Sequence, residues 1–518
     1  MRLAAPRSRP PTWLGMVLLG TLQAWSVCWP WSSSVQAPSV WWLQLLVMGL
    51  LYRALTAREA SNFGRGFRIG WWFATAWLVA TFWWLFLSMH LYGGLAAPLA
   101  ASAVVALAAA LALYYSVALG LFCKWRSALG PAASACVFAG LWLLAELCRG
   151  VWWTGFGWGA IGYAHGDGPL APAAPWVGVY GMAFAAAAAS AYLASRQFGW
   201  IRKGAAATVV AVVAISLQGL DWTRSTGTIS VALLQGNIAQ DQKFETGSGI
   251  PDALAWYARE LTQARAQLVV APETAIPLLP QQLAPDYWEG LQQHFQSGNT
   301  MALIGMPWGS YSEGYTNAVV ALRPGTNSLW RYDKHHLVPF GEFIPTGFRW
   351  FTRMMDIPLG DFRRGPVGAD SIAWQGQRLA PHICYEDLFG EELGARFSRS
   401  GQEPTVFVNA SNIAWFGKTV AIDQHLQISR MRALEFQRPM VRATNTGATA
   451  VIDHRGMVGP VLGYQTRGVL HAEVEGRTGN TPFATWISQW GLWPLWGLGS
   501  MLAVWAWHRH RRQVAQGS

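Results

Sequence analysis

Charged residues are scarce in this sequence. Only 13% of its 518 residues are Asp, Glu, Lys or Arg, whereas 52% are hydrophobic. Soluble globular domains carry about 25% charged residues, and disordered chains are poor in hydrophobic ones. The composition therefore excludes a wholly soluble protein of this length and an intrinsically disordered one. We expect a large part of the chain to lie in a lipid bilayer, and the 32 tryptophans, a residue type that favours membrane interfaces, support this.

Cysteine is also scarce, and its distribution excludes a disulfide scaffold. The chain has five cysteines, and four of them fall in apolar runs: Cys28, Cys123, Cys136 and Cys148. Cys384 alone lies in polar sequence. No second cysteine and no His-x-x-x-His pair completes a zinc ligand set around it, so no metal site is predicted.

Acidic residues are nearly absent outside one segment. Residues 221–487 contain 24 of the 27 Asp and Glu residues and 22 of the 38 Lys and Arg residues. The rest of the chain holds the remaining 3 acidic and 16 basic residues, and so carries the positive excess behind the net charge of +11. An excess confined to apolar sequence is typical of loops that orient membrane helices, and it gives no reason to expect a nucleic-acid partner.

Eight apolar runs are predicted to cross the membrane, because a helix needs about 20 apolar residues to span the hydrocarbon layer. They lie at residues 12–28, 39–52, 69–89, 95–122, 132–147, 173–194, 204–220 and 488–507. The second and fifth are short, and either is a candidate for a partly re-entrant segment. Basic residues gather in the connections on one side, whereas the opposite short loops carry only Arg149. By the positive-inside rule both termini are cytoplasmic.

This topology divides the chain into three parts. Residues 1–220 form a membrane domain of seven helices, residues 221–487 an extracytoplasmic domain, and residues 488–518 a C-terminal helix with a basic tail. The first run has an alternative interpretation as a signal peptide, since arginines precede it and Val35-Gln36-Ala37 has the form of a cleavage site. Pro38 disfavours cleavage there, and cleavage would leave the later alternation of sides unchanged.

The segment from residue 228 to 487 alternates between short β-branched runs and amphipathic stretches, which is typical of an α/β domain. Buried strands are predicted at residues 229–234, 267–271, 301–305, 317–322, 379–384 and 405–409, and a helix at 426–434. No Pro- or Ser-rich linker interrupts the segment, so we expect a single domain.

Three chemically complementary side chains, Glu273, Lys334 and Cys384, follow predicted strands. A thiolate attacks an electrophile, a carboxylate takes the thiol proton, and an ammonium stabilises an oxyanion. Taken singly, each residue has a structural alternative: a helix cap, a solvated surface lysine and a small buried hydrophobe. The intervals of 61 and 50 residues between them mean that only a fold can bring them together.

The sequence around these residues resembles the nitrilase superfamily, and more narrowly its membrane-integrated branch, the apolipoprotein N-acyltransferases. The three motifs that carry the resemblance are Ala271-Pro-Glu273-Thr, Tyr332-Asp-Lys334-His-His-Leu-Val-Pro-Phe-Gly-Glu342-Phe-Ile-Pro and Ile383-Cys384-Tyr385-Glu386. It extends to Asn412-Ile-Ala-Trp415-Phe-Gly, Gln424-His425, Arg430-Met-Arg-Ala-Leu-Glu435, Arg442-Ala-Thr-Asn445-Thr-Gly and, in the membrane half, Glu146-Leu-Cys-Arg149-Gly and Thr154-Gly-Phe-Gly-Trp158.

The resemblance implies an α-β-β-α sandwich, a catalytic triad at Glu273, Lys334 and Cys384, and supporting roles for Glu342, Tyr385 and Glu386. It implies transfer of an acyl chain from a membrane phospholipid, commonly phosphatidylethanolamine, to the N-terminal α-amino group of a diacylglyceryl-cysteine lipoprotein, through a thioester and without a cofactor. The implied location is the bacterial inner membrane, with the catalytic domain on the periplasmic side.

Substrate contacts are expected at a further set of positions: Phe244, Trp350, Phe351, Asn412, Trp415 and His425. Phe244 stands where the family usually has Trp, and Ile413 replaces a common Asp, so both departures bear on substrate fit. The hydrophobic residues between 340 and 355 are expected to form either a lid that grips lipid or a packed satellite core.

Other functions are compatible with parts of this pattern. A membrane-tethered amidase or nitrilase would use the same triad on a small C–N bond and would not consume phospholipid. A non-catalytic membrane scaffold would have no chemical reason to keep a carboxylate, an amine and a thiol at three strand ends. A transporter is disfavoured, because Glu146 is the only acidic residue within a predicted span.

Overall fold

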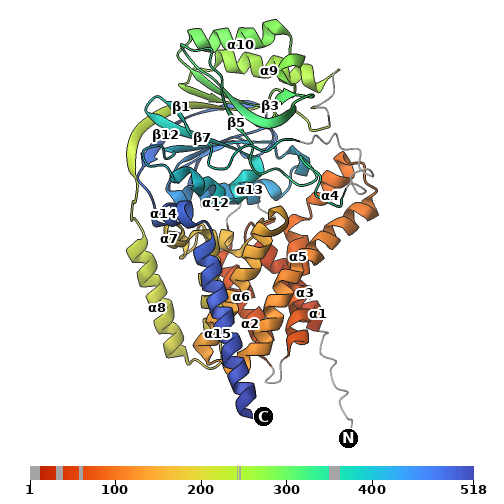
Figure 1. Ribbon diagram of the computed structural model, residues 1–518, viewed down its shortest axis with the longest axis vertical. Helices are drawn as coiled ribbons and strands as arrows, with labels where there is room; N and C mark the ends of the chain where they lie inside the picture. The colour runs from red at the N-terminus through yellow and green to blue at the C-terminus, as the bar shows by residue number, and fades with distance from the viewer. Residues whose placement is uncertain are drawn as a thin grey trace.

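The computed structural model describes residues 12–30, 39–57, 62–241, 243, 247–348 and 362–517. Figure 1 shows a bundle of helices at one end of the molecule and an α/β domain at the other, with the C-terminus at the helical end. Of the residues expected to contact substrate, Phe244, Trp350 and Phe351 lie outside the described residues.

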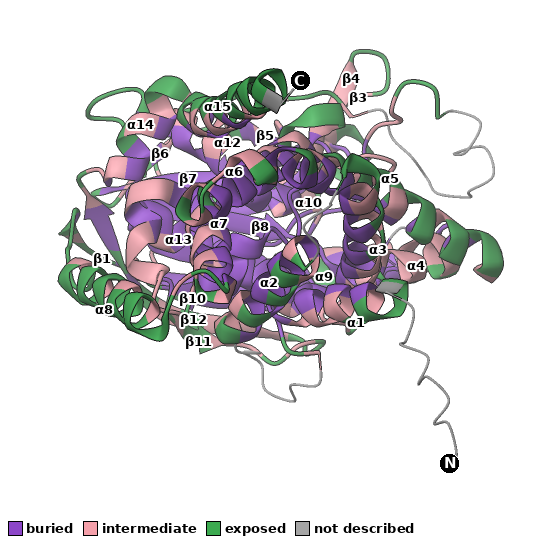
Figure 2. Ribbon diagram, turned by 90° about the horizontal axis from the view of Figure 1, so that it is seen from below, coloured by how far each residue is buried: buried purple, intermediate pink, exposed green. Residues whose placement is uncertain are grey.

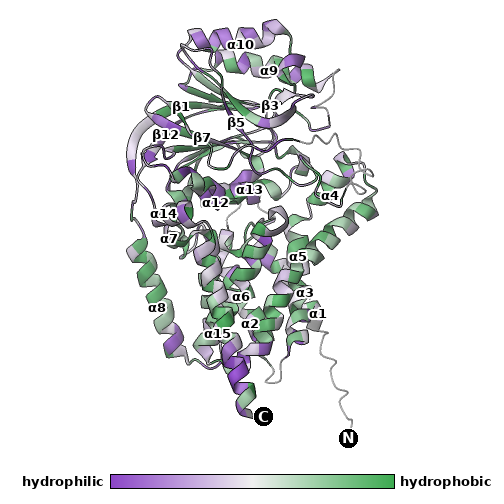
Figure 3. Ribbon diagram, in the orientation of Figure 1, coloured by the Kyte–Doolittle hydropathy of each residue, from purple (hydrophilic) through white to green (hydrophobic). Residues whose placement is uncertain are grey.

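The helical end contains a helix that overlaps each predicted apolar run. These helices are α1 (Thr12–Trp25), α2 (Trp41–Thr56), α3 (Phe63–Phe82), α5 (Ala97–Trp125), α6 (Pro131–Val151), α7 (Ala174–Ala194), α8 (Trp200–Leu217) and α15 (Trp493–Gly517). Hydrophobic residues dominate this part of the molecule, and the end of α15 that lies away from the α/β domain is hydrophilic (Figure 3). α8 has no buried residue, and it lies at the periphery when the molecule is seen from the helical end (Figure 2).

Four helical stretches among the described residues are long and apolar enough to cross a membrane: Ala97–Ala128, Pro131–Thr154, Ala171–Ala194 and Trp200–Leu217. A bent pair formed by α3 and the segment Leu85–Tyr92 makes a fifth if it is counted as one span. The count of eight spans, the domain boundaries and the orientation therefore stay predictions.

The third predicted run is bent, which its sequence did not indicate. α3 ends at Phe82, and the segment Leu85–Tyr92, which begins with the short helix α4 (Leu85–Leu87), continues at 62° to it. The Thr81 hydroxyl donates to the Trp77 carbonyl (2.8 Å), and Trp84 Nε1 donates to the Thr81 carbonyl (3.0 Å). Hydrogen bonds from side chains to backbone carbonyls of the last helical turn are a recognised cause of helix bending.

The α/β domain contains two six-stranded sheets. The first has the strand order β12-β1-β2-β3-β4-β5, with β12 (Gly468–Thr478), β1 (Arg224–Gln235), β2 (Leu268–Val270), β3 (Met301–Ser310), β4 (Gly314–Leu322) and β5 (Trp330–Asp333). The second has the order β11-β10-β9-β8-β7-β6, with β11 (Val458–Val461), β10 (Ala450–Ile452), β9 (Met440–Thr444), β8 (Val406–Ser411), β7 (Gln377–Ile383) and β6 (Ile372–Trp374). All six predicted strands are present, and β1–β2–β3 and β7–β8–β9 are parallel.

Helices cover the outer face of each sheet (Figure 1). α9 (Gly249–Gln263) and α10 (Pro285–Ser297) lie on the first, while α12 (Gly390–Gly394), α13 (Ala421–Phe436) and α14 (Pro482–Trp490) lie between the second and the helical end. One apolar core, which includes Leu233, Ile383 and Val408, fills the space between the sheets. The expected α-β-β-α sandwich is therefore confirmed, and α13 is the helix predicted at 426–434 with five residues more at its start.

The loop after α6 connects the helical end to the sandwich. Arg149 is buried, and its Nη1 donates to the carbonyls of Phe156 and Trp158 (both 2.7 Å). Glu146 Oε1 accepts from the Ile161 amide (2.9 Å). These two charged side chains therefore hold the loop that carries Gly155 and Trp158 against the end of α6.

Candidate active site

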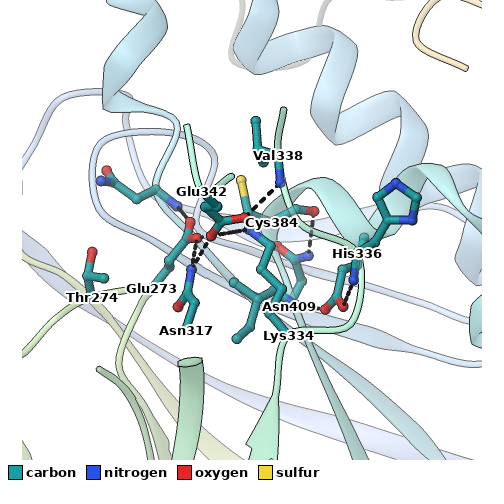
Figure 4. Close-up of polar contacts among 12 residues, drawn as sticks. Glu273, Thr274, Asn317, Lys334, His336, Val338, Glu342, Cys384 and Asn409 are labelled. Atoms are coloured by element: carbon teal, nitrogen blue, oxygen red, sulfur yellow. Dashed lines mark hydrogen bonds and ion pairs between the residues drawn. The ribbon is translucent and has the colours of Figure 1, made fainter. Parts of the chain in front are cut away.

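The fold brings the three predicted catalytic side chains to one place between the two sheets. Glu273 lies three residues beyond β2, and Lys334 directly follows β5, both in the first sheet. Cys384 directly follows β7 in the second sheet. Figure 4 shows the Cys384 sulfur next to the side chains of Glu273, Lys334 and Glu342. The site therefore needs both sheets, which is why residues so distant in sequence meet.

Lys334 lies between two carboxylates. Its Nζ is 3.2 Å from Glu273 Oε1 and 3.0 Å from Glu342 Oε1, and the lysine is only 1% exposed. Burial alone would lower the pKa of Lys334, but the two carboxylates raise it above its ordinary value. The two carboxylates therefore favour the ammonium form of Lys334 and fix its position between them.

The two carboxylates also share a neutral donor. Asn317 Nδ2 lies 2.7 Å from Glu273 Oε1 and 2.6 Å from Glu342 Oε1. Burial raises the pKa of Glu342, against the opposing effect of Lys334. Glu273 Oε2 accepts from the backbone amide of Asn412 (2.9 Å). These contacts fix the Glu273 carboxylate beside the thiol, where it can act as a base.

Cys384 occupies a strained backbone position and holds its proton in the resting state. Its φ is +50°, in the left-handed region that non-glycine residues seldom adopt. Burial raises the pKa of the Cys384 thiol to about 12, and the Glu273 carboxylate adds to this increase, whereas Lys334 opposes it. Activation of this sulfur therefore requires a base at the moment of attack.

The Glu386 side chain connects the segments that carry Lys334 and Cys384. Both of its side-chain oxygens accept hydrogen bonds from residues that flank Lys334 and Cys384. The donors are the Tyr332 hydroxyl (2.8 Å to each oxygen) and the backbone amides of His335 (2.7 Å), His336 (3.1 Å) and Ile383 (2.6 Å). One carboxylate therefore ties the lysine segment of the first sheet to the cysteine segment of the second.

The other residues predicted from the motifs connect the site to the helical end. The Tyr385 hydroxyl donates to the Gly155 carbonyl (2.9 Å). The Trp415 ring packs edge-on against Tyr92, at a centroid distance of 5.7 Å. His425 Nε2 lies 3.2 Å from the carbonyl oxygen of Cys384, so it contacts the backbone of this cysteine. In the segment predicted as a lid or satellite core, the rings of Phe340 and Phe348 pack edge-on at 5.4 Å, and residues 349–361 lie outside the described residues.

Two residues of this site were not proposed as functional from the sequence. Asn317 is the first residue of a predicted strand. A polar amide at the start of an apolar run was the sequence signal that could have marked it as functional. Lys243 is the second: its Nζ is 3.2 Å from the Glu273 carbonyl and 2.6 Å from Thr274 Oγ1. Burial lowers the pKa of Lys243 to about 7, although Glu273 and Cys384 act in the opposite direction.

Lys243 gives the site a testable pH dependence. Below pH 7 the Lys243 amine is charged and stabilises the Cys384 thiolate, and this stabilisation is lost as the pH rises through 7. We therefore expect Lys243→Met to slow alkylation of Cys384 by iodoacetamide by about 3- to 10-fold at pH 6, and by less at pH 8. Lys418→Met, which removes an exposed lysine, is the control. An equal effect of Lys243→Met at both pH values would contradict this role.

Comparisons with known proteins agree with the fold and the motifs. The carbon-nitrogen hydrolase family model matches residues 230–483, so the α/β domain places the chain in the nitrilase superfamily. A model of the apolipoprotein N-acyltransferase N-terminal domain matches residues 29–192. Together with the relatives described next, these matches show that the chain belongs to the apolipoprotein N-acyltransferase family.

Two relatives match along nearly the whole chain. The apolipoprotein N-acyltransferase of Verminephrobacter eiseniae is 55% identical, and the match covers 97% of each chain. The apolipoprotein N-acyltransferase of Ralstonia nicotianae is 45% identical, over 92% of this chain and 90% of the relative. Among solved structures, a carbon-nitrogen hydrolase from Helicobacter pylori is 17% identical, covers 52% of this chain and 94% of its own, and has a TM-score of 0.35.

Proposed function

We propose that this protein transfers an acyl chain from a membrane phospholipid, with phosphatidylethanolamine as a donor, to the N-terminal α-amino group of a diacylglyceryl-cysteine lipoprotein. The acyl chain rests as a thioester on Cys384 between the two steps. The observation that carries the proposal is the Glu273–Lys334–Glu342 cluster, with its 3.2 and 3.0 Å ion pairs, beside a partly buried thiol. Family membership supplies the class of acceptor.

In the first step Glu273 takes the proton of the Cys384 thiol as the sulfur attacks the carbonyl carbon of a glycerol ester. Lys334 and a backbone N–H beside Cys384 stabilise the oxyanion. The ester C–O bond then breaks, and the departing glycerol oxygen receives the proton from Glu273. The products are a lysophospholipid and an S-acylated Cys384.

In the second step the α-amine of the lipoprotein attacks the thioester carbonyl, and Glu273 accepts the proton that the nitrogen loses. The C–S bond breaks, an amide forms, and Glu273 returns the proton to the sulfur. A single nucleophile that serves donor and acceptor in turn requires a double-displacement mechanism. Exclusion of water from the thioester stage preserves the acyl chain for the amine.

The helical end gives this chemistry its location. Moving a long acyl chain into water costs about 0.8 kcal/mol per CH₂, so an enzyme that takes acyl chains from lipid must keep its nucleophile at the bilayer surface. Tyr385, the residue after the nucleophile, is bonded to Gly155 in the loop that follows α6. We infer an inner-membrane protein with cytoplasmic termini and the sandwich on the periplasmic side.

The proposal is tested with purified full-length protein, phosphatidylethanolamine labelled in its acyl chains, and a synthetic diacylated lipopeptide. Lysophospholipid and triacylated lipopeptide should appear in equal amounts. With an N-acetylated lipopeptide, which has no free α-amine, no triacylated product should form and lysophospholipid should not exceed one equivalent per enzyme. The amidase alternative predicts instead release of ammonia from small amides without consumption of phospholipid. Absence of the triacylated product from an enzyme whose Cys384 reacts with thiol reagents would refute the proposed acceptor.

A further inference from the structure

Side chains of the second sheet and of α13 contact the strained backbone of Cys384. A φ of +50° at a non-glycine residue persists only where the surroundings fix it. The Cys384 carbonyl faces two side-chain nitrogens, His425 Nε2 at 3.2 Å and Asn409 Nδ2 at 3.4 Å. His425 makes the shorter contact and belongs to α13, the helix that packs on the helical end.

The surroundings of His425 fix which ring nitrogen carries the proton. Arg442 Nη2 lies 3.1 Å from His425 Nδ1, and a guanidinium only donates, so Nδ1 accepts and Nε2 carries the hydrogen that faces Cys384. Asp387 Oδ2 accepts from Arg442 Nη1 (2.9 Å) and so holds the guanidinium. Burial lowers the pKa of His425 to about 3, with a further contribution from Arg442. The imidazole is therefore oriented as a neutral donor toward the Cys384 carbonyl.

The residue before His425 bonds directly to the bend after α3. Gln424 is 2% exposed, and its Nε2 donates to the Thr81 carbonyl at the end of α3 (3.0 Å). Its Oε1 accepts from Trp84 Nε1 (3.0 Å) and from Trp158 Nε1 (2.8 Å). The Gln424 side-chain amide therefore hydrogen-bonds to three groups of the helical end, and both its nitrogen and its oxygen have partners.

Trp158 connects the two adjacent residues. Its indole nitrogen bonds to Gln424, and its ring stacks on the imidazole of His425 at a centroid distance of 5.6 Å and an interplanar angle of 27°. The Trp158 carbonyl is in turn held by Arg149 (2.7 Å). A continuous set of contacts therefore runs from the bent segment of the helical end, through Gln424 and Trp158, to His425 and the backbone of the nucleophile.

We propose that Gln424 and His425 are positioning residues, which hold Cys384 in its reactive backbone conformation by fixing it to the bend between α3 and α4. In this arrangement the reactivity of Cys384 depends on correct seating of the sandwich on the helical end. This role rests on the proposed function only for measurements of acyl transfer, because alkylation of Cys384 needs no acyl donor.

The chain offers a matched control for Gln424 on the same helix. Gln427 is also 2% exposed, and its Nε2 donates to the Tyr163 carbonyl in the helical end (3.1 Å). Gln424→Leu and Gln427→Leu therefore each remove a buried amide that bonds the sandwich to the helical end. Only Gln424 lies next to the histidine that contacts the nucleophile.

The experiment uses full-length protein in detergent and measures two rates. The first is alkylation of Cys384 by iodoacetamide, which needs no acyl donor, and the second is acyl transfer resolved into kcat and KM. We expect Gln424→Leu to lower the alkylation rate and kcat about 10-fold, with little change in KM for phospholipid, because a small displacement of a reacting group costs rate more than binding. Gln427→Leu should leave both rates within about 2-fold of the unsubstituted protein.

Replacements of His425 supply a second, independent comparison. A glutamine amide reaches the position of Nε2, so His425→Gln should retain most of the alkylation rate, whereas His425→Leu should lose about 10-fold or more. Equal losses in Gln424→Leu and Gln427→Leu, or equal losses in His425→Gln and His425→Leu, would overturn the proposal and indicate general loosening of the fold. If acyl transfer is absent but alkylation still separates the paired variants, the proposed function fails and this inference stands.

Discussion

Replacement of Cys384 by Ala is expected to abolish acyl transfer, with a loss of about 10⁴-fold or more in kcat, because the variant has no atom on which the acyl chain can rest. The measurement is mass spectrometry of the intact protein after incubation with phospholipid and no acceptor. The unsubstituted protein should gain one acyl group, and Cys384→Ala should gain none.

Cys136 provides the control for this experiment. It is the exposed free cysteine of α6, and Cys136→Ala should keep both the adduct and full turnover. An acyl adduct that persists in Cys384→Ala would show that another residue carries the acyl chain, and the thioester mechanism would then be wrong.

Replacement of Lys334 by Met is expected to remove activity and to destabilise the protein. The oxyanion loses its ammonium, for which we expect a loss of about 10²- to 10³-fold or more in kcat. Glu273 and Glu342 lose their shared buried partner at 3.2 and 3.0 Å, which typically destabilises a protein by about 3–5 kcal/mol. Turnover and thermal unfolding in detergent measure the two effects separately.

The destabilisation by Lys334→Met should depend on pH in a defined direction. Burial and the nearby Glu273 carboxylate already raise the pKa of Glu342, and loss of the opposing ammonium raises it further above that of the unfolded chain. The folded state then binds more protons, so stability falls as the pH rises and the variant should be least affected at acid pH. A loss that grows toward low pH would contradict this account.

A double variant separates charge from catalysis. Lys334→Met combined with Glu342→Gln leaves a single carboxylate, Glu273, which still accepts from Asn317 (2.7 Å) and the Asn412 amide (2.9 Å). We expect this pair of substitutions to recover much of the lost stability and none of the lost turnover. Recovery of turnover would remove Lys334 from the proposed oxyanion site.

The residue types of the site were predictable because their signals are local. Cys384 is the only cysteine in polar sequence, and Glu273 and Lys334 follow runs that are recognisable as strands. The partners of these residues were less predictable. Asn317 is predicted as the start of an ordinary strand, and only the way the segments after β2 and β5 lie beside β4 shows that its amide bridges Glu273 and Glu342.

His425 and Glu146 illustrate the same limit. A contact of His425 with substrate stays a prediction, and the sequence did not indicate the contact that the structure shows, between its Nε2 and the Cys384 carbonyl at 3.2 Å. Glu146 and Arg149 lie three residues apart in α6, and the sequence did not indicate their partners: Glu146 accepts from the Ile161 amide, and Arg149 donates to the Phe156 and Trp158 carbonyls. The partner of a buried polar group depends on loops that return from elsewhere in the chain.

The apolar helices, most strands of the sandwich, the family and the three candidate residues Glu273, Lys334 and Cys384 could be recognised from the sequence, because periodicity, composition and short motifs are local properties. The fold was needed to show that Lys334 is shared by two carboxylates, that Glu386 ties the two sheets together, and that Gln424 joins the contacts around Cys384 to the bend after α3. The physical reason is that burial makes hydrogen-bond and charge partners obligatory, and these partners come from segments tens to hundreds of residues apart.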